Sequence, residues 1–198
     1  MTREELLAVL RPHIGDGRVL AAMAEIPREE FVAPGDRGRA YENCALGIAC
    51  GQSISQPIVV ARMSEVLRIE PGDRVLDVGT GSGYQAAVLA RLGARVTSIE
   101  IHPELSRAAA TRLGPEVELI VGDGRRGHPP GAPYDAICVA ATADGTIPPA
   151  LLAQLAPGGR LVAPLRIRGT ERLVLIERGP DGTLQREALE EVRFVPLV

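Results

Sequence analysis

The sequence predicts an α/β fold in which a doubly wound, mainly parallel sheet follows a set of N-terminal helices. From residue 73 onward, short runs of valine, leucine and isoleucine alternate with helical segments, which is the pattern of βαβ units. The glycine-rich stretch "VGTGSG" lies between the first such strand and its helix. Beyond "RLVAPLRI" the helices stop, and "GPDG" separates "RLVLIER" from "LEEVRFVPLV". These last runs predict a C-terminal antiparallel strand pair.

The first part of the chain is predicted to form a helical cap. Thr2 and Glu5 have the spacing of a capping box, and a leucine-rich helical stripe follows them. A second short helix is predicted in "RVLAAMAEI". Pro57 is placed to open a third helix, because proline is well tolerated in the first helical turn.

Length and hydrophobicity indicate one folding unit. The chain has 198 residues, of which 45% are hydrophobic, enough to bury a substantial core. We therefore expect a single domain over 1–198, with a helical cap and substrate loop in 1–56 and a Rossmann-like core in 57–198.

Composition limits the partners and the compartment. The formal net charge is -3 and the arginines are scattered, so no nucleic-acid footprint is visible. Cys44, Cys50 and Cys138 form neither a CxxC pair nor an even set, which argues against a disulfide framework and a zinc site. No run of eighteen apolar residues is present. We expect a cytoplasmic monomer with no metal and no nucleic-acid or membrane partner.

The spacing of the glycines indicates which cofactor the turn holds. A dinucleotide fingerprint GxGxxG would need glycine at position 84, which is Tyr84. Gly79, Gly81 and Gly83 form GxGxG instead, with Asp77 two residues before the first glycine. This arrangement resembles motif I of S-adenosylmethionine-dependent methyltransferases.

Acidic residues close the next two strands. Glu100 ends "RVTSIE", where a carboxylate can accept both ribose hydroxyls of an adenosine cofactor, and Asp123 in "GDG" could face the adenine amino group. Both are expected at the carboxyl edge of the sheet, where ligands bind in open α/β folds. The alternative is that they are solvated strand-end acids or caps.

The chain as a whole resembles the protein-L-isoaspartate O-methyltransferase family. The resemblance rests on "IPREEFV", "AYENCALGI", "GQSISQP", "VLDVGTGSGYQAAVLA", "IPPALLAQLAPGGRLVAPL" and "VRFVPLV". It implies a class I methyltransferase fold, S-adenosylmethionine as cofactor, and isoaspartyl-containing proteins and peptides as partners. It also implies transfer of a methyl group to the isoaspartyl carboxylate, after which a succinimide forms and repair begins.

The resemblance also implies which residues form the site. Ser55 corresponds to the functional serine of the family, and Ser53 stands where threonine is usual. Ser53, Gln56, Val195 and Pro196 are expected at the substrate. The implied cofactor-binding residues are Asp77, Gly79, Gly81, Gly83, Glu100, Asp123 and Gly124.

Methyl transfer to a carboxylate explains why the serines have no general base beside them. A carboxylate is already ionised at neutral pH, so no proton has to be removed. Alignment of the reacting atoms in a dry pocket is what accelerates the displacement. A serine hydroxyl can donate one hydrogen bond to the carboxylate without adding a competing charge. The alternative is that Ser55 is the N-cap of the helix that begins at Pro57.

Two departures from the family leave the substrate open. Glu171 and Arg172 stand where a glutamine is frequent, and the loop around Asp144 is longer than usual. One alternative is a relative that methylates a normal aspartate in a dedicated precursor peptide. Another is a non-catalytic S-adenosylmethionine-binding module.

Overall fold

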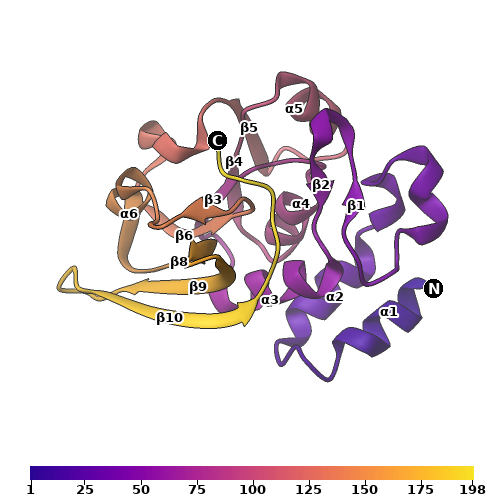
Figure 1. The fold of residues 1–198 in the computed structure, drawn as a ribbon, viewed down its shortest axis with the longest axis horizontal. Coiled ribbons are helices and arrows are strands. Elements are labelled where there is room, and N and C mark those ends of the chain that lie inside the picture. The colour runs from indigo at the N-terminus through magenta and orange to yellow at the C-terminus, as the bar shows by residue number, and fades with distance from the viewer.

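The computed structural model describes residues 1–198 and begins with helices that pack beside the sheet (Figure 1). The predicted capping box is present at Thr2 and Glu5. Short 3-10 turns and a two-stranded ribbon connect the second and third helices. The elements of this part are α1 (Arg3–Leu10), α2 (Gly17–Glu25), β1 (Leu46–Gly47), β2 (Ser53–Ile54) and α3 (Pro57–Leu67).

The main sheet has the strand order β10-β9-β8-β6-β3-β4-β5, and the short β7 also pairs with β8. Neighbouring strands from β8 to β5 run parallel, whereas β9 and β10 are antiparallel. The predicted fold class is therefore confirmed. The strands are β3 (Arg74–Val78), β4 (Arg95–Glu100), β5 (Val117–Val121), β6 (Tyr134–Val139), β7 (Ala143–Asp144), β8 (Leu155–Ile167), β9 (Thr170–Arg178) and β10 (Leu184–Glu191).

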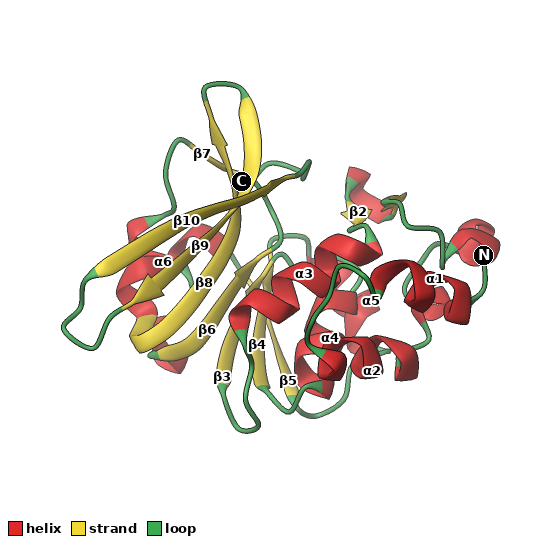
Figure 2. Cartoon of the chain, turned by 90° about the horizontal axis from the view of Figure 1, so that it is seen from below, coloured by secondary structure: helices red, strands yellow, loops and turns green.

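Helices cover both faces of the sheet (Figure 2). One core cluster of 31 buried residues joins the N-terminal helices, α3 and α4 (Tyr84–Arg91) to one face. A second cluster of 15 lies on the other face, where α6 (Pro149–Gln154) contributes Leu151. Helix α5 (Pro103–Ala110) packs against β4 and β5. Leu6 and Val75 belong to the same cluster, so the N-terminal helices share their core with the sheet.

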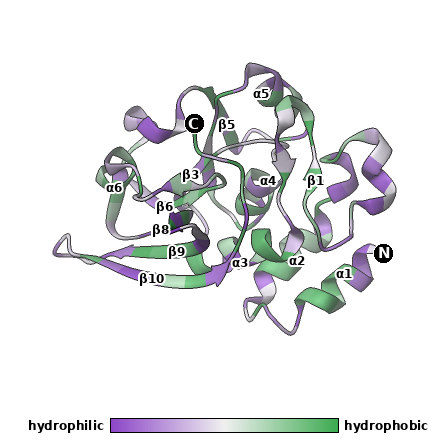
Figure 3. Ribbon diagram, in the orientation of Figure 1, coloured by the Kyte–Doolittle hydropathy of each residue, from purple (hydrophilic) through white to green (hydrophobic).

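The last three strands form a simple meander. β9 hydrogen-bonds to β8, and β10 lies outside β9. Residues of β9 alternate into the two core clusters, while β10 is almost entirely exposed. Figure 3 shows the same contrast, with β9 largely hydrophobic and β10 largely hydrophilic.

The prediction that "VRFVPLV" continues the terminal strand is wrong. β10 ends at Glu191 after an irregular step in its register, and residues 192–198, called the tail here, leave the sheet. The tail instead runs beside Thr142, whose N–H donates to the Val195 carbonyl at 2.8 Å and whose carbonyl accepts from Leu197 N–H at 2.8 Å. Pro196 has no N–H, so it suits this single bridge better than the interior of a ladder.

Candidate active site

The glycine turn between β3 and α4 is held in a conformation that favours glycine. The φ angles of Gly79, Gly81 and Gly83 are 94°, 53° and 91°, a region that other residues adopt only with strain. A Cβ atom on Gly83 would lie 3.2 Å from the side chains of Ala109 and Leu113. Gly83 therefore allows α4 to begin close to α5, while Gly79 and Gly81 line a cavity.

Glu100 secures this turn through its carboxylate. It is only 5% exposed, and its two oxygens accept the Gly81 N–H at 2.8 Å and the His102 N–H at 2.9 Å. The alternative of a solvated strand-end acid is thus wrong for Glu100. Because each carboxylate oxygen has a further lone pair, Glu100 can still accept two hydroxyl groups.

The glycine-turn cavity lies at the carboxyl edge of β3 and β4. Glu100 and Gly124 line it together with Gly79, Gly81 and the apolar Ile101, and residues 195–198 of the tail cover it. Its volume is about 60 Å³, whereas ligand pockets commonly measure about 300–1,000 Å³. The tail residues thus narrow this cavity at the carboxyl edge of the sheet.

Asp77 lies beneath the turn rather than in the cavity. Its side chain is fully buried, and one oxygen accepts the Ser98 hydroxyl at 2.7 Å while the other has no partner. Ser98 in turn pairs with the Thr80 hydroxyl at 2.6 Å, which ties Asp77 to the glycine turn. Burial is the main cause that raises the pKa of Asp77 to about 7, and the nearby Glu100 adds to it. Sequence reasoning missed Ser98 and Thr80.

Replacing Asp77 by asparagine should change how stability depends on pH. A carboxyl whose pKa is 3.8 when unfolded and about 7 when folded favours folding most below pH 4 and loses that effect as the pH rises through 7. Between pH 5 and pH 8, the free energy of unfolding of Asp77→Asn should gain about 2–3 kcal/mol relative to the parent. Urea unfolding of both proteins without cofactor measures this. A constant difference between the two proteins across that range would contradict the raised pKa of Asp77.

Asp123 and Gly124 take different places. The Asp123 carboxylate accepts the N–H and the guanidinium of Arg125 at 2.9–3.0 Å, so it caps the turn after β5, as the alternative held. These bonds lower the pKa of Asp123. Asp123 does not line the glycine-turn cavity, but Gly124 does. A Cβ on Gly124 would lie 2.5 Å from Val78 Cγ1, which explains the glycine.

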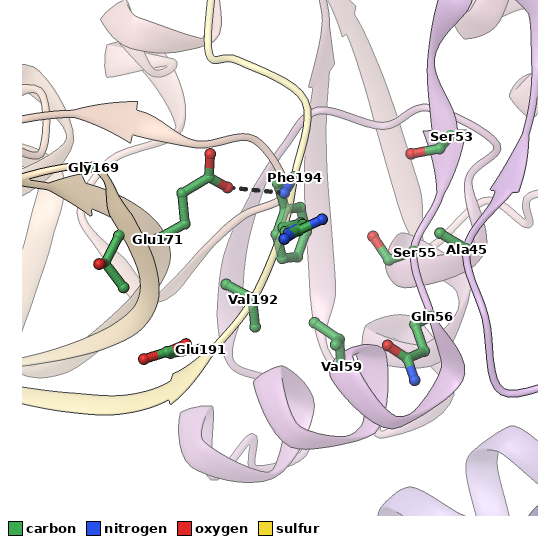
Figure 4. Close-up of a pocket in the computed structure, with 12 residues that line it drawn as sticks. Ala45, Ser53, Ser55, Gln56, Val59, Gly169, Glu171, Glu191, Val192 and Phe194 are labelled. Atoms are coloured by element: carbon green, nitrogen blue, oxygen red, sulfur yellow. Dashed lines mark hydrogen bonds between the residues drawn. The ribbon is translucent and has the colours of Figure 1, made fainter.

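The serines of "GQSISQP" face a second and larger space. This serine-loop cavity measures about 710 Å³ and is lined by Ser53, Ser55 and Gln56 on one side. Figure 4 shows both serine hydroxyls directed toward Phe194 across it. Ser53 also lines the glycine-turn cavity, so the two spaces adjoin at this serine.

Ser55 is not the helix cap, so that alternative is wrong. The N-cap position of α3 is Gln56, which makes no side-chain capping bond. Asn43 Oδ1 accepts the Ile58 N–H at 3.1 Å instead, and Gln56 Nε2 donates to the Asn43 carbonyl at 2.7 Å. The Ser55 hydroxyl makes no hydrogen bond within the protein, whereas the Ser55 carbonyl accepts from Arg28 at 2.8 Å. The hydroxyl is therefore available to a ligand.

The opposite wall of the serine-loop cavity contains Glu171 and the start of the tail. The Glu171 carboxylate accepts the Phe194 N–H at 3.1 Å (Figure 4). It also accepts the Thr142 hydroxyl at 3.1 Å and pairs with Arg166. Burial opposes its ionisation, but the bonds from Arg166, Phe194 and Thr142 outweigh burial and lower the pKa of Glu171. Glu171, which stands where the family often has glutamine, thus holds the tail in place between the two cavities.

Val195 and Pro196, which are expected at the substrate, lie on the side of the tail that faces the glycine-turn cavity. They line the glycine-turn cavity and not the serine-loop cavity, whose tail residues are Val192, Arg193 and Phe194. No pattern in the sequence shows which tail residues line which cavity, because this depends on which side of the tail faces each cavity.

The fold and the glycine-turn cavity define a class of enzyme. A parallel sheet with a GxGxG turn after β3 and a buried glutamate at the end of β4 is the arrangement of class I S-adenosylmethionine-dependent methyltransferases. The model of the protein-L-isoaspartate(D-aspartate) O-methyltransferase family matches residues 1–198. The chain belongs to this family, as its sequence motifs indicated.

Curated relatives with the same family name match this chain over its full length. A protein-L-isoaspartate O-methyltransferase from Halorhodospira halophila is 52% identical over 204 residues, covering 100% of this chain and 91% of the relative. One from Anaeromyxobacter dehalogenans is 50% identical over 205 residues, covering 100% of this chain and 97% of the relative.

Solved structures of the family have the same fold. The structure of a protein-L-isoaspartate O-methyltransferase superposes on this chain with a TM-score of 0.88 at 29% identity. The match covers 98% of this chain and 65% of the solved chain. A beta-aspartate methyltransferase from Plasmodium falciparum, in complex with S-adenosyl-L-homocysteine, has a TM-score of 0.86 at 25% identity and covers 100% of this chain and 99% of its own. The predicted enzyme class and S-adenosylmethionine dependence are confirmed, and the precursor-peptide alternative is not favoured.

Proposed function

We propose that this chain transfers the methyl group of S-adenosylmethionine to the free carboxylate of L-isoaspartyl residues in damaged proteins and peptides. The observation that carries the proposal is the position of the serines. Ser53 and Ser55 line a large open cavity, and Ser53 also lines the adjoining glycine-turn cavity. A carboxylate held at this junction would lie between the two spaces.

The residues of the glycine-turn cavity suit the cofactor chemically. Glu100 keeps free lone pairs for ribose hydroxyls. Ile101 is 41% exposed although apolar, and it lines the cavity where an adenine ring could cover it. When bound, S-adenosylmethionine supplies an electrophilic methyl group on a positively charged sulfur.

The protein's part in the reaction is alignment. The Ser55 hydroxyl would donate a hydrogen bond to one carboxylate oxygen, which would leave the other oxygen free to face the methyl group that the cofactor supplies. Val192 and Phe194 of the tail provide apolar surface on the facing wall. With a peptide filling the open cavity, this surface would help to exclude water, which would otherwise stabilise the separated charges that the reaction neutralises.

The location, the oligomeric state and the choice of partners are also part of what we propose. We place the reaction in the cytoplasm, by a monomer that acts on proteins and peptides and not on nucleic acid. No helix of the chain has the length and apolar character needed to cross a bilayer.

A pair of peptides tests the proposed function. The two would share one sequence and differ only in an aspartyl or isoaspartyl linkage, and each would be incubated with methyl-labelled cofactor. We expect base-labile label on the isoaspartyl peptide at a rate at least about 100-fold above the aspartyl peptide, because the site aligns one carboxylate geometry. Label on the aspartyl peptide would support the precursor-peptide alternative, and cofactor binding without transfer would support a non-catalytic module.

A further inference from the structure

Arg28 is a fully buried cation without an acidic partner. Its side chain is 0% exposed, and none of the salt bridges in the structure includes it. One of its terminal nitrogens, Nη1, is buried without any hydrogen bond. A buried and unpaired charge destabilises a fold. The cost of burying Arg28 therefore suggests that this side chain has a role other than stabilising the fold.

The guanidinium of Arg28 joins three segments around the active site. Its Nε donates to the Ala40 carbonyl at 2.8 Å, and its Nη2 donates to the Ser55 carbonyl at 2.8 Å. Its Cζ atom lies over the ring of Tyr84, 4.7 Å from the ring centroid. Tyr84 is the first residue of α4, directly after Gly83. Arg28 thus links the serine loop to the element that follows the glycine turn.

The position of Ser55 depends on its backbone. Its hydroxyl points into the serine-loop cavity, and its carbonyl is bonded to Arg28 on the buried side. Fixing the carbonyl limits how far the hydroxyl can move relative to the glycine turn. A displacement of about 1 Å in such a group can lower a rate by about 100-fold.

We propose that Arg28 is the positioning residue for Ser55, holding the serine loop in register with the glycine turn through the Ser55 carbonyl and the Tyr84 ring. The inference rests on the proposed role of Ser55. A lysine could not replace this arrangement, because its single ammonium group lacks the fork with which the guanidinium donates to two carbonyls while its Cζ lies over the Tyr84 ring.

A double-mutant cycle tests the proposal on the full chain. The four proteins are the parent, Arg28→Lys, Ser55→Ala and the combination, each assayed for kcat and KM with an isoaspartyl peptide. We expect Arg28→Lys to lower kcat about 10-fold in the parent and less than about 2-fold in the Ser55→Ala background, because residues that act through one another are not additive. The affinity for S-adenosylhomocysteine should stay within about 2-fold. Arg37→Lys, at an exposed arginine in the same segment, is the matched control.

Each outcome bears on a separate claim. If Arg28→Lys lowers kcat by the same factor in both backgrounds, or has no effect in the parent, the positioning role is overturned. The single variant Ser55→Ala tests the proposed role of Ser55 by itself. A failure of that role can therefore be distinguished from a failure of the positioning role of Arg28. Should Arg28→Lys fail to fold, Arg28→Gln gives the same cycle, because its neutral amide removes the buried charge and still donates to only one of the two carbonyls.

Discussion

Ser55→Ala should lower kcat for an isoaspartyl peptide by about 100-fold while the affinity for S-adenosylhomocysteine stays within about 2-fold. A hydrogen bond to a charged group contributes about 1.5–3 kcal/mol, and loss of alignment adds to that loss. The Ser55 hydroxyl makes no hydrogen bond within the protein and Ser55 lines the serine-loop cavity, so removal of the hydroxyl should leave stability nearly unchanged. Steady-state kinetics together with calorimetric binding of the cofactor product measure both quantities.

A matched serine shows whether the effect belongs to the site. Ser106 is buried in α5 and lines neither of the two cavities, so Ser106→Ala should retain the parent kcat. If Ser55→Ala kept full activity with unchanged peptide affinity, the orienting role of Ser55 would be wrong. A rise in KM alone would assign Ser55 to peptide binding and not to alignment.

Glu100→Ala should weaken binding of S-adenosylhomocysteine by about 100-fold or more. The substitution removes the acceptor of the Gly81 and His102 N–H groups, which leaves both without that partner beside the cavity. It also removes the carboxylate expected to accept the ribose hydroxyls. Charge-assisted bonds of this kind contribute about 1.5–3 kcal/mol each, so the loss of two corresponds to at least that fold-change. Titration calorimetry with the cofactor product gives the dissociation constant.

A nearby acid separates a local effect from a change in overall charge. Glu104 is exposed in the first turn of α5, and Glu104→Ala removes the same charge without touching the glycine turn. We expect its dissociation constant for the cofactor product to equal that of the parent. Equal weakening by both substitutions would mean that long-range charge, and not the bonds of Glu100, governs binding.

The parts of the site that sequence reasoning found are those with a local signature. The GxGxG spacing places Gly79 and Gly81 between a strand and a helix, and the strand pattern places Glu100 at the carboxyl edge. A periodic pattern of this kind is determined by neighbours along the chain. The structure brings these three residues to one cavity.

Sequence reasoning could not find contacts between residues that are distant along the chain. Asp77 is expected at the cofactor from its spacing, and the structure places it below the turn, where it accepts from Ser98. Ser55 was a possible helix cap, but Asn43 supplies the capping oxygen from another segment. Nothing in the spacing of either residue reveals such contacts, because they form only when separate elements pack.

By itself, the sequence determined the class of fold, the order of helices and strands, and the family, since each follows from periodicity, turn residues and contiguous motifs. Tertiary structure alone decided the path of the tail, which Thr142 and Glu171 hold between the two cavities. It also decided the burial of Arg28 behind Ser55. Hydrogen bonds across long chain separations determine both features, and their geometry exists only once the sheet and the helices have packed together.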